Sequence, residues 1–154
     1  MALEVLEAIS QGTATVPRDV HHDLESLLWV IMYAIYKYCI NIDGNNEELK
    51  KEFKTFFGAT SMEKIVMIHY YAISRGQPKL RKCLQGLGQE RLFFVLLASS
   101  DLLLYQNPAV QDGVTPQMQA YFNRTRKGKT QERAVIAYAD LFDMLDAAEA
   151  TVES

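Results

Sequence analysis

The sequence contains little cysteine: of its 154 residues, only Cys39 and Cys83 could form a disulfide or offer sulfur to a metal. Neither belongs to a CxxC motif, and both have apolar neighbours in a helical context. Such cysteines are usually buried reduced thiols, which disfavours both a disulfide and a zinc site. The N-terminal MALEVLEAIS carries acids where a secretory signal has lysines and a long apolar core. We therefore expect a reducing compartment, the cytoplasm or the nucleus.

Long apolar runs and excess positive charge are also missing. The longest uninterrupted apolar stretch, residues 27–36, has 10 residues, whereas a membrane-spanning helix needs roughly 20. The formal net charge is −3 at pH 7, which gives no electrostatic reason to bind nucleic acid or an anionic membrane surface. We expect neither of them as the main partner.

Signatures of strands and of phosphate-binding loops are absent as well. Alternation of polar and apolar residues never extends beyond three or four positions, and no internal repeat is visible. Neither GxxxxGK[ST] nor GxGxxG occurs, and Gly86-Leu87-Gly88 is best interpreted as a helix stop. The sequence therefore predicts one all-α domain over residues 1–149, followed by a frayed tail at 150–154.

The dominant feature that is present is the nearly uncharged segment at residues 22–42. Every residue from 27 to 36 is apolar or aromatic. A helix that is apolar all round is buried on several sides, so we expect a central helix, beginning at Asp19 or His22, against which others pack. A buried strand is the alternative, which is disfavoured because a single strand of this length would be unusual.

About seven further helices are expected around this central helix. Residues 1–10 predict a short one, with Leu3, Leu6 and Ile9 as a stripe that lies against the central helix. The others are expected at residues 48–57, 61–74, 78–84, 90–105, 116–125 and 131–148.

Capping residues support these boundaries. Asn45 with Glu48 and Thr60 with Glu63 have the spacing of capping pairs, and Thr115 precedes Pro116 at a helix start. In the last helix we expect one apolar stripe, made of Val135, Tyr138, Leu141, Phe142 and Leu145.

Few residues suggest chemistry on their own. His21, His22 and Asp23 invite a metal hypothesis, but adjacent helical residues point about 100° apart, whereas zinc on a helix prefers ligands at i and i+4. Polar residues at a helix start are the better interpretation. His69 stands alone among apolar residues and is best explained as a core or half-exposed histidine.

Two charged clusters are most simply explained as solvated surface. Arg124, Arg126, Lys127 and Lys129 form a basic turn that could touch a phosphate or an acidic partner. Asp140, Asp143 and Asp146 follow each other at three-residue steps, but a hard cation needs six or more converging oxygens from a bent loop.

One longer pattern is more specific. MALEVL at residues 1–6 and HDLESLLWV at residues 22–30 resemble the C-terminal lobe of fungal-type protein kinases, in which an FMAxEVL stretch precedes HDLESFFYVLLW. The FFGATS segment at 56–61 looks like that family's Phe-Gly-x-Thr/Ser segment. The resemblance covers about residues 1–70 and implies a helical half-lobe of a phosphotransferase.

By position, the resemblance implies roles for two acids. Glu4 would be the buried acid at the end of the activation segment, paired with an arginine for which Arg81 and Arg91 are candidates. Asp23 would match the aspartate that holds the catalytic-loop backbone. Because that loop is not in this chain, we expect the Asp23 carboxylate to act as a cap instead, meeting backbone N–H groups in the first turn of its own helix, or His21, Arg18 or Thr15 in the loop before it. We also expect exposed apolar surface around residues 27–36, where the preceding kinase helices would pack.

The departures from the family define the expected function. A kinase needs a Gly-rich loop, a strand lysine, an HRDxxxxN loop and a DFG aspartate, and this sequence has none of them. We therefore expect a C-terminal lobe fragment without catalytic residues, with ATP and Mg²⁺ implied only for a full-length relative, and with the missing N-terminal kinase portion or another protein as partner. The alternative is a free-standing helical interaction module or pseudokinase remnant without enzymatic activity. An unrelated helical enzyme lacks any candidate site.

Overall fold

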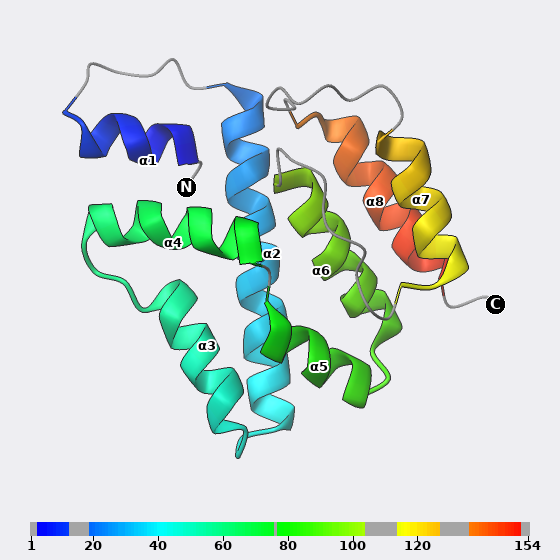
Figure 1. Ribbon diagram of the computed structural model, residues 1–154. Helices are drawn as coiled ribbons and strands as arrows, with labels where there is room; N and C mark the ends of the chain where they lie inside the picture. Colours follow the sequence, from blue (N-terminus) through cyan, green and yellow to red (C-terminus); the bar gives the residue numbers. More distant parts are fainter. Residues whose placement is uncertain (1–2, 13–18, 76, 104–113, 127–135, 152–154) are drawn as a thin grey trace.

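The computed structural model describes residues 3–12, 19–75, 77–103, 114–126 and 136–151, and all regular structure within these ranges is helical (Figure 1). Seven helices accompany the central one, as the sequence predicts. The eight are α1 (Leu3–Ser10), α2 (Val20–Ile42), α3 (Glu47–Phe57), α4 (Met62–Arg75), α5 (Pro78–Gly86), α6 (Glu90–Leu103), α7 (Pro116–Arg126) and α8 (Tyr138–Ala150).

The start of α2 is fixed by a reciprocal cap. The Asp19 carboxylate accepts a hydrogen bond of 2.6 Å from the Val20 N–H, and the Asp19 N–H donates to Nδ1 of His22 over 3.1 Å. These bonds satisfy N–H groups that have no partner in the first turn of a helix. The sequence allows this helix to begin at Asp19 or at His22, and the structure uses Asp19.

Helices α2 and α6 form the centre of the molecule. Helix α2 packs against α3, α5 and α6, and α6 also packs against α5 and α8. Nine residues of α6 are buried, so it is the second core helix, as expected. Helix α2 is buried along one face only, by residues that include Leu28, Met32 and Tyr36. The expected burial on several sides is therefore wrong, whereas the exposure of Leu27 and Val30 agrees with the exposed apolar surface expected around residues 27–36.

Helix α1 does not lie mainly against α2, as predicted, but against α4, and it touches α2 only at its margin (Figure 1). Leu6 is buried, whereas Ile9, expected in the same stripe, is 51% exposed. A helix of two turns can bury only one or two of its apolar side chains against a neighbouring helix. Leu6 alone anchors this one within the part of α1 whose side chains are described.

Three predicted caps can be compared with the structure. Thr115 caps α7, because its hydroxyl accepts from the Met118 N–H over 3.3 Å. The cap of α3 is Asn46, not Asn45: its side chain accepts from the Leu49 N–H over 3.0 Å. Helix α4 begins at Met62, directly after Ser61, so Thr60 stands one residue too early to be its cap.

The last helix differs most from its prediction. It begins at Tyr138, not near residue 131, and the backbone of Ala137 is extended, with φ −111° and ψ 161°. Residues 127–135, which include Val135, lie outside the described residues. The C-terminal end extends further than expected, because Ala150 belongs to α8 and the Thr151 hydroxyl, which is buried, donates to the Ala148 carbonyl.

The apolar stripe expected on α8 is divided between core and surface. Its buried face is Leu141, Met144 and Ala148, whereas Tyr138 and Phe142 are 57% and 60% exposed and Leu145 is 41% exposed. The stripe was predicted too wide, since only the positions directed at α6 are covered.

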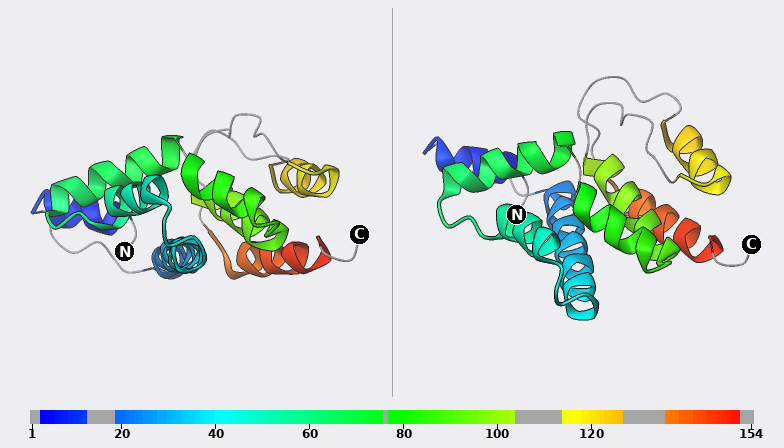
Figure 2. Two further views of the ribbon diagram at one scale, coloured as in Figure 1. Left: turned by 90° about the horizontal axis from the view of Figure 1, so that it is seen from below. Right: turned by 60° about the horizontal axis from the view of Figure 1, so that its bottom comes forward.

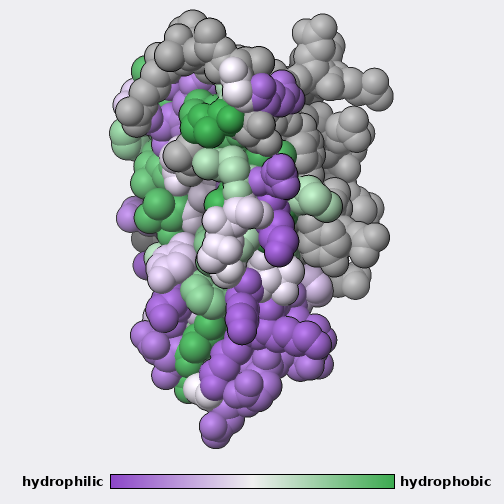
Figure 3. All heavy atoms as spheres, turned by 90° about the vertical axis from the view of Figure 1, so that its left-hand side faces the viewer, coloured by the Kyte–Doolittle hydropathy of each residue, from purple (hydrophilic) through white to green (hydrophobic). Residues whose placement is uncertain are grey.

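The side of the molecule formed by α1, α3 and α4 has a mixed surface. Figure 3 shows hydrophilic residues gathered over its lower part, near α3 and the α2–α3 turn, and hydrophobic residues above them and along one edge. The polar part agrees with the sequence of α3, in which the core residues Leu49 and Phe56 are separated by charged positions.

Candidate functional site

One face of the central helix is uncovered. We call it the α2 outer face and define it by five exposed residues at helical spacing, namely Asp23, Leu27, Val30, Ala34 and Tyr38. Val30 is 60% exposed and Leu27 is 41% exposed. Figure 2 (left) shows α2 end-on at the edge of the molecule, with α3, α4 and α5 all on one side of it. Apolar surface on a central helix is a typical place for another protein segment to pack.

Asp23 lies on this outer face one turn into α2, where it is exposed. It is not the N-cap of α2, because Asp19 fills that role together with His22. The cap role expected of Asp23 is therefore wrong, whereas its expected contacts with Arg18 or Thr15 fall on residues outside the described ranges and stay a prediction. Its place beside Leu27 and Val30 makes it part of the same outer face.

A second feature lies at the other end of α2. A pocket of about 610 Å³ opens between the α2–α3 turn and α5, lined by Ile42, Asp43, Asn46, Glu48, Lys79, Lys82, Cys83, Gly86 and Leu87. Its rim is ordered by side-chain bonds: Asn46 donates to the Asp43 carboxylate over 2.9 Å, and Lys79 pairs with Glu48 at 3.2 Å. The pocket therefore offers charges of both signs around an apolar wall.

The two cysteines meet behind this pocket. Cys39 of α2 is fully buried, and Cys83 of α5 is 9% exposed and lines the pocket. Burial, then the charge of Cys83 and an interaction with its thiol, raise the pKa of the Cys39 thiol to about 12. Burial also raises the pKa of Cys83, whereas its hydrogen bond with Cys39 lowers it and Asp43 raises it. Both are buried free thiols, as the sequence predicts, and both belong to one core cluster.

A polar cluster joins α2, α3 and α5 beneath the surface. The Glu52 carboxylate of α3 accepts three hydrogen bonds: from the Tyr36 hydroxyl over 2.8 Å, and from the Lys79 and Leu80 N–H groups over 3.0 Å each. The last two N–H groups belong to the first turn of α5, where a negative charge is favoured by the helix dipole. Glu52 therefore caps a helix to which it does not belong.

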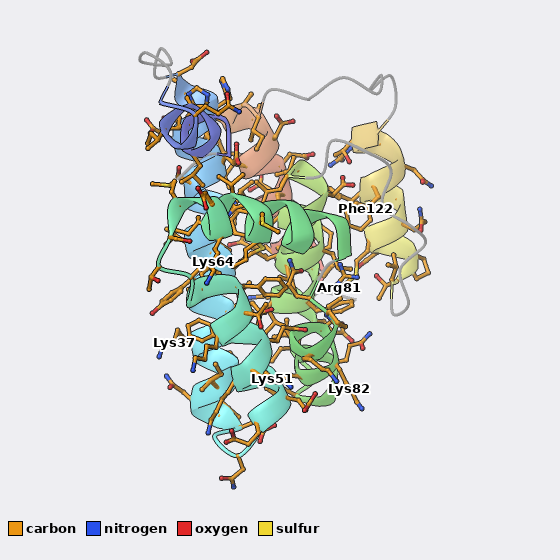
Figure 4. The ribbon with its side chains drawn as sticks, turned by 60° about the vertical axis from the view of Figure 1, so that its left-hand side comes forward. Lys37, Lys51, Lys64, Arg81, Lys82 and Phe122 are labelled. Carbon is orange, nitrogen blue, oxygen red and sulfur yellow. The ribbon has the colours of Figure 1, made fainter. Side chains whose placement is uncertain are left out.

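Arg81 completes this cluster. Figure 4 shows it nearer the middle of the molecule than the labelled lysines. Burial lowers the pKa of its guanidinium, while Glu52 and Tyr36 raise it, and its Nε has no hydrogen-bond partner. Arg81 thus contributes a half-buried positive charge beside the Glu52 carboxylate.

The Tyr36 hydroxyl makes the stability of the protein sensitive to alkali. Burial, then the charge of Glu52 and the hydrogen bond to it, raise the pKa of Tyr36 far above its ordinary value of about 10. Above pH 10 the unfolded chain loses this proton while the folded chain keeps it. Folding stability is therefore complete below pH 10 and declines above it, by about 1.4 kcal/mol per pH unit for this group.

We expect Tyr36→Phe to make the decline of the unfolding free energy between about pH 10 and 11.5 shallower by that amount. At pH 7 the same change should cost about 1 kcal/mol, because the bond to Glu52 is lost. Urea unfolding followed by circular dichroism at a series of pH values measures both effects. Parallel pH profiles for the two proteins would contradict the assignment.

The histidines serve the fold. His22 is buried in the cap of α2, and the His21 ring contacts it at a centroid distance of 3.9 Å. His69 is half-buried, contacts the Trp29 ring at 4.0 Å and donates from its Nδ1–H to the Ile65 carbonyl over 2.8 Å. Burial lowers the pKa of His69. Within the described ranges, no three His, Cys, Asp or Glu side chains converge as metal ligands would.

The remaining charged candidates do not form one site. Arg124 and Arg126 of the predicted basic turn belong to α7. Arg124 pairs with Asp143 at 2.6 Å, and Asp140 accepts from the Ala137 N–H over 2.8 Å at the start of α8. Residues 127–129 lie outside the described residues. Figure 4 shows that the labelled lysines come from α2, α3, α4 and α5 and are spread over this side: Lys37, Lys51, Lys64 and Lys82.

The structure does not test the ion pair that the kinase resemblance implies for Glu4. Glu4 lies on α1, but its side chain is outside the described residues. Of its two candidate partners, Arg91 is exposed at the start of α6 and Arg81 lies beside Glu52.

Comparison of the chain with protein-family models, with curated proteins and with solved structures found no match. Among the described helices, none combines the length and the apolar character that crossing a membrane requires.

Proposed function

We propose that this chain is the C-terminal helical part of a fungal-type protein-kinase-like lobe, acting in the cytoplasm or nucleus, and that the preceding part of the kinase packs on the α2 outer face. The observation that carries this proposal is the exposure of Asp23, Leu27, Val30 and Ala34 along one side of the central helix.

The resemblance to the kinase lobe would explain why the α2 outer face is exposed in this chain. Asp23 is at the position expected to hold the catalytic-loop backbone, and it is directed to solvent rather than into the chain's own core. The next outward residues, Leu27, Val30 and Ala34, are apolar and follow at steps of four, three and four. A loop bound at Asp23 and helices packed on the apolar positions would cover the face with matching chemistry.

On this proposal the chain has no phosphotransfer activity of its own. In kinases the nucleotide is held by the Gly-rich loop, the strand lysine and Mg²⁺ on the DFG aspartate and the catalytic-loop asparagine, and the sequence has none of these. Glu4 and Asp23 match structural positions of the family and neither would touch the γ-phosphate.

The decisive experiment joins the chain to its preceding portion. The coding sequence upstream of Met1 is read for in-frame HRD-like and DFG-like stretches, and the encoded segment is co-expressed with this chain. We expect co-purification that Val30→Asp abolishes, and Mg²⁺-dependent ATP binding by the complex but not by this chain alone. The absence of such stretches, or saturable Mg²⁺-dependent ATP binding by the chain alone at micromolar concentration, would refute the proposal.

The second candidate is a free-standing helical interaction module. The observation in its favour is the exposed stripe of Tyr138, Phe142 and Leu145 on α8, which lies outside the part of the chain that the kinase resemblance covers. A chain without upstream kinase motifs that is monomeric by light scattering would favour this role.

A further inference from the structure

The pair of cysteines carries an inference that is independent of the kinase proposal. Cys39 and Cys83 are 44 residues apart in the sequence, and the packing of α2 on α5 brings their thiols close enough for each to shift the pKa of the other. Both belong to one apolar core cluster. Two thiols in contact differ from a lone buried cysteine, because either can react with a sulfur electrophile formed at the other.

The two cysteines also differ in access. Cys39 has no exposed surface, whereas Cys83 is 9% exposed and forms part of the pocket wall between the α2–α3 turn and α5. A small reagent can therefore reach Cys83 from the pocket but can reach Cys39 only through Cys83. This asymmetry assigns the two roles that a disulfide-forming pair needs, an attacking thiol at the surface and a resolving thiol behind it.

We propose that Cys39 and Cys83 form an oxidation site, at which a peroxide that enters the pocket is reduced and a disulfide links α2 to α5. The Cys83 thiolate attacks one peroxide oxygen, the O–O bond breaks, and Cys83 becomes a sulfenic acid while the first water leaves. The Cys39 sulfur then attacks the Cys83 sulfur, the S–O bond breaks, and the second water leaves. Two thiols and one hydrogen peroxide thus give one disulfide and two waters.

Burial and charge both act on the first step. Burial, and after it the nearby Asp43, raise the pKa of Cys83 and so disfavour its thiolate, while Lys82 is a positive charge on the same wall and Lys79 is paired with Glu48. Because the thiolate is the nucleophile, the reaction should be faster at pH 8 than at neutral pH.

Intact mass spectrometry tests the proposal on the full chain. Reduced protein is treated with hydrogen peroxide at pH 8 and alkylated in denaturant. We expect the wild-type chain to lose the mass of two hydrogens and to take up no alkyl group. Cys39→Ser and Cys83→Ser, each checked for folding by circular dichroism, should form no such product. A wild-type chain that keeps both thiols, stops at a sulfinic acid, or forms disulfides only between chains would overturn the proposal.

Two further measurements do not depend on oxidation. Phenylarsine oxide, whose trivalent arsenic bridges two neighbouring thiols, should bind the wild-type chain in a one-to-one complex and neither serine variant. Iodoacetamide should label Cys83 before Cys39 in the folded chain, because only Cys83 lines the pocket. Arsenical binding to a single-cysteine variant would overturn the assignment of the pair, and first labelling at Cys39 would overturn that of Cys83 as the attacking thiol.

Discussion

Replacing Glu52 with alanine is expected to lower the free energy of unfolding by about 3–5 kcal/mol. The change removes the acceptor of three hydrogen bonds, from the Tyr36 hydroxyl and from the Lys79 and Leu80 N–H groups. It also leaves Arg81 half-buried without the carboxylate that stabilises its charge. Urea unfolding at pH 7, followed by circular dichroism, measures the loss.

Two variants of the same helix separate this effect from a general weakening of α3. Glu52→Gln keeps one oxygen for Tyr36 and Leu80 but places an NH₂ group against the Lys79 N–H, so we expect an intermediate loss of about 1–2 kcal/mol. Glu48→Ala removes only the exposed pair with Lys79, which should cost less than about 0.5 kcal/mol. Equal losses for Glu52→Ala and Glu48→Ala would disprove the capping role of Glu52.

The sequence predicts those helices whose ends are determined by neighbouring residues. Thr115 and Pro116 define the start of α7, and Pro78 stands in the first turn of α5. In each case the residue acts on backbone groups within one helical turn, so its effect does not depend on the rest of the fold. The central position of α2 also follows from its own composition.

Predictions failed where the outcome depends on distant packing. The sequence of α8 has enough apolar residues for a wide stripe, and only its packing on α6 selects Leu141, Met144 and Ala148 as the buried set. Helix α1 could likewise pack on α2 or on α4, and only the tertiary packing selects α4. One local signal was missed: Asp140, which accepts from the Ala137 N–H, marks the start of α8.

The residues that form the candidate sites could be named only from the structure. Cys39 and Cys83, and likewise Glu52 and the start of α5, are far apart in the sequence and share no motif. Their contacts follow from how α2, α3 and α5 cross, which no local pattern encodes. Asp23 and its apolar neighbours could be placed together from the sequence, because all of them lie on one predicted helix.

Met32→Asp is expected to lower the free energy of unfolding by more than about 4 kcal/mol, or to prevent folding, whereas Val30→Asp should change it by less than about 0.5 kcal/mol. The residues are two positions apart on α2, so they point to opposite sides of the helix. Met32 is 2% exposed in the core, and Val30 is 60% exposed on the α2 outer face. Expression yield, circular dichroism and urea unfolding compare the two variants directly.

The same pair tests whether the outer face is open in solution. If wild-type chains associate through this face, light scattering should report a mass that grows with concentration, and Val30→Asp should abolish this growth because an aspartate cannot be buried unpaired in an apolar contact. If instead Val30→Asp costs as much stability as Met32→Asp at every protein concentration, Val30 is buried within the single chain. The α2 outer face would then be closed, and the proposal that a preceding kinase portion packs on it would fail with it.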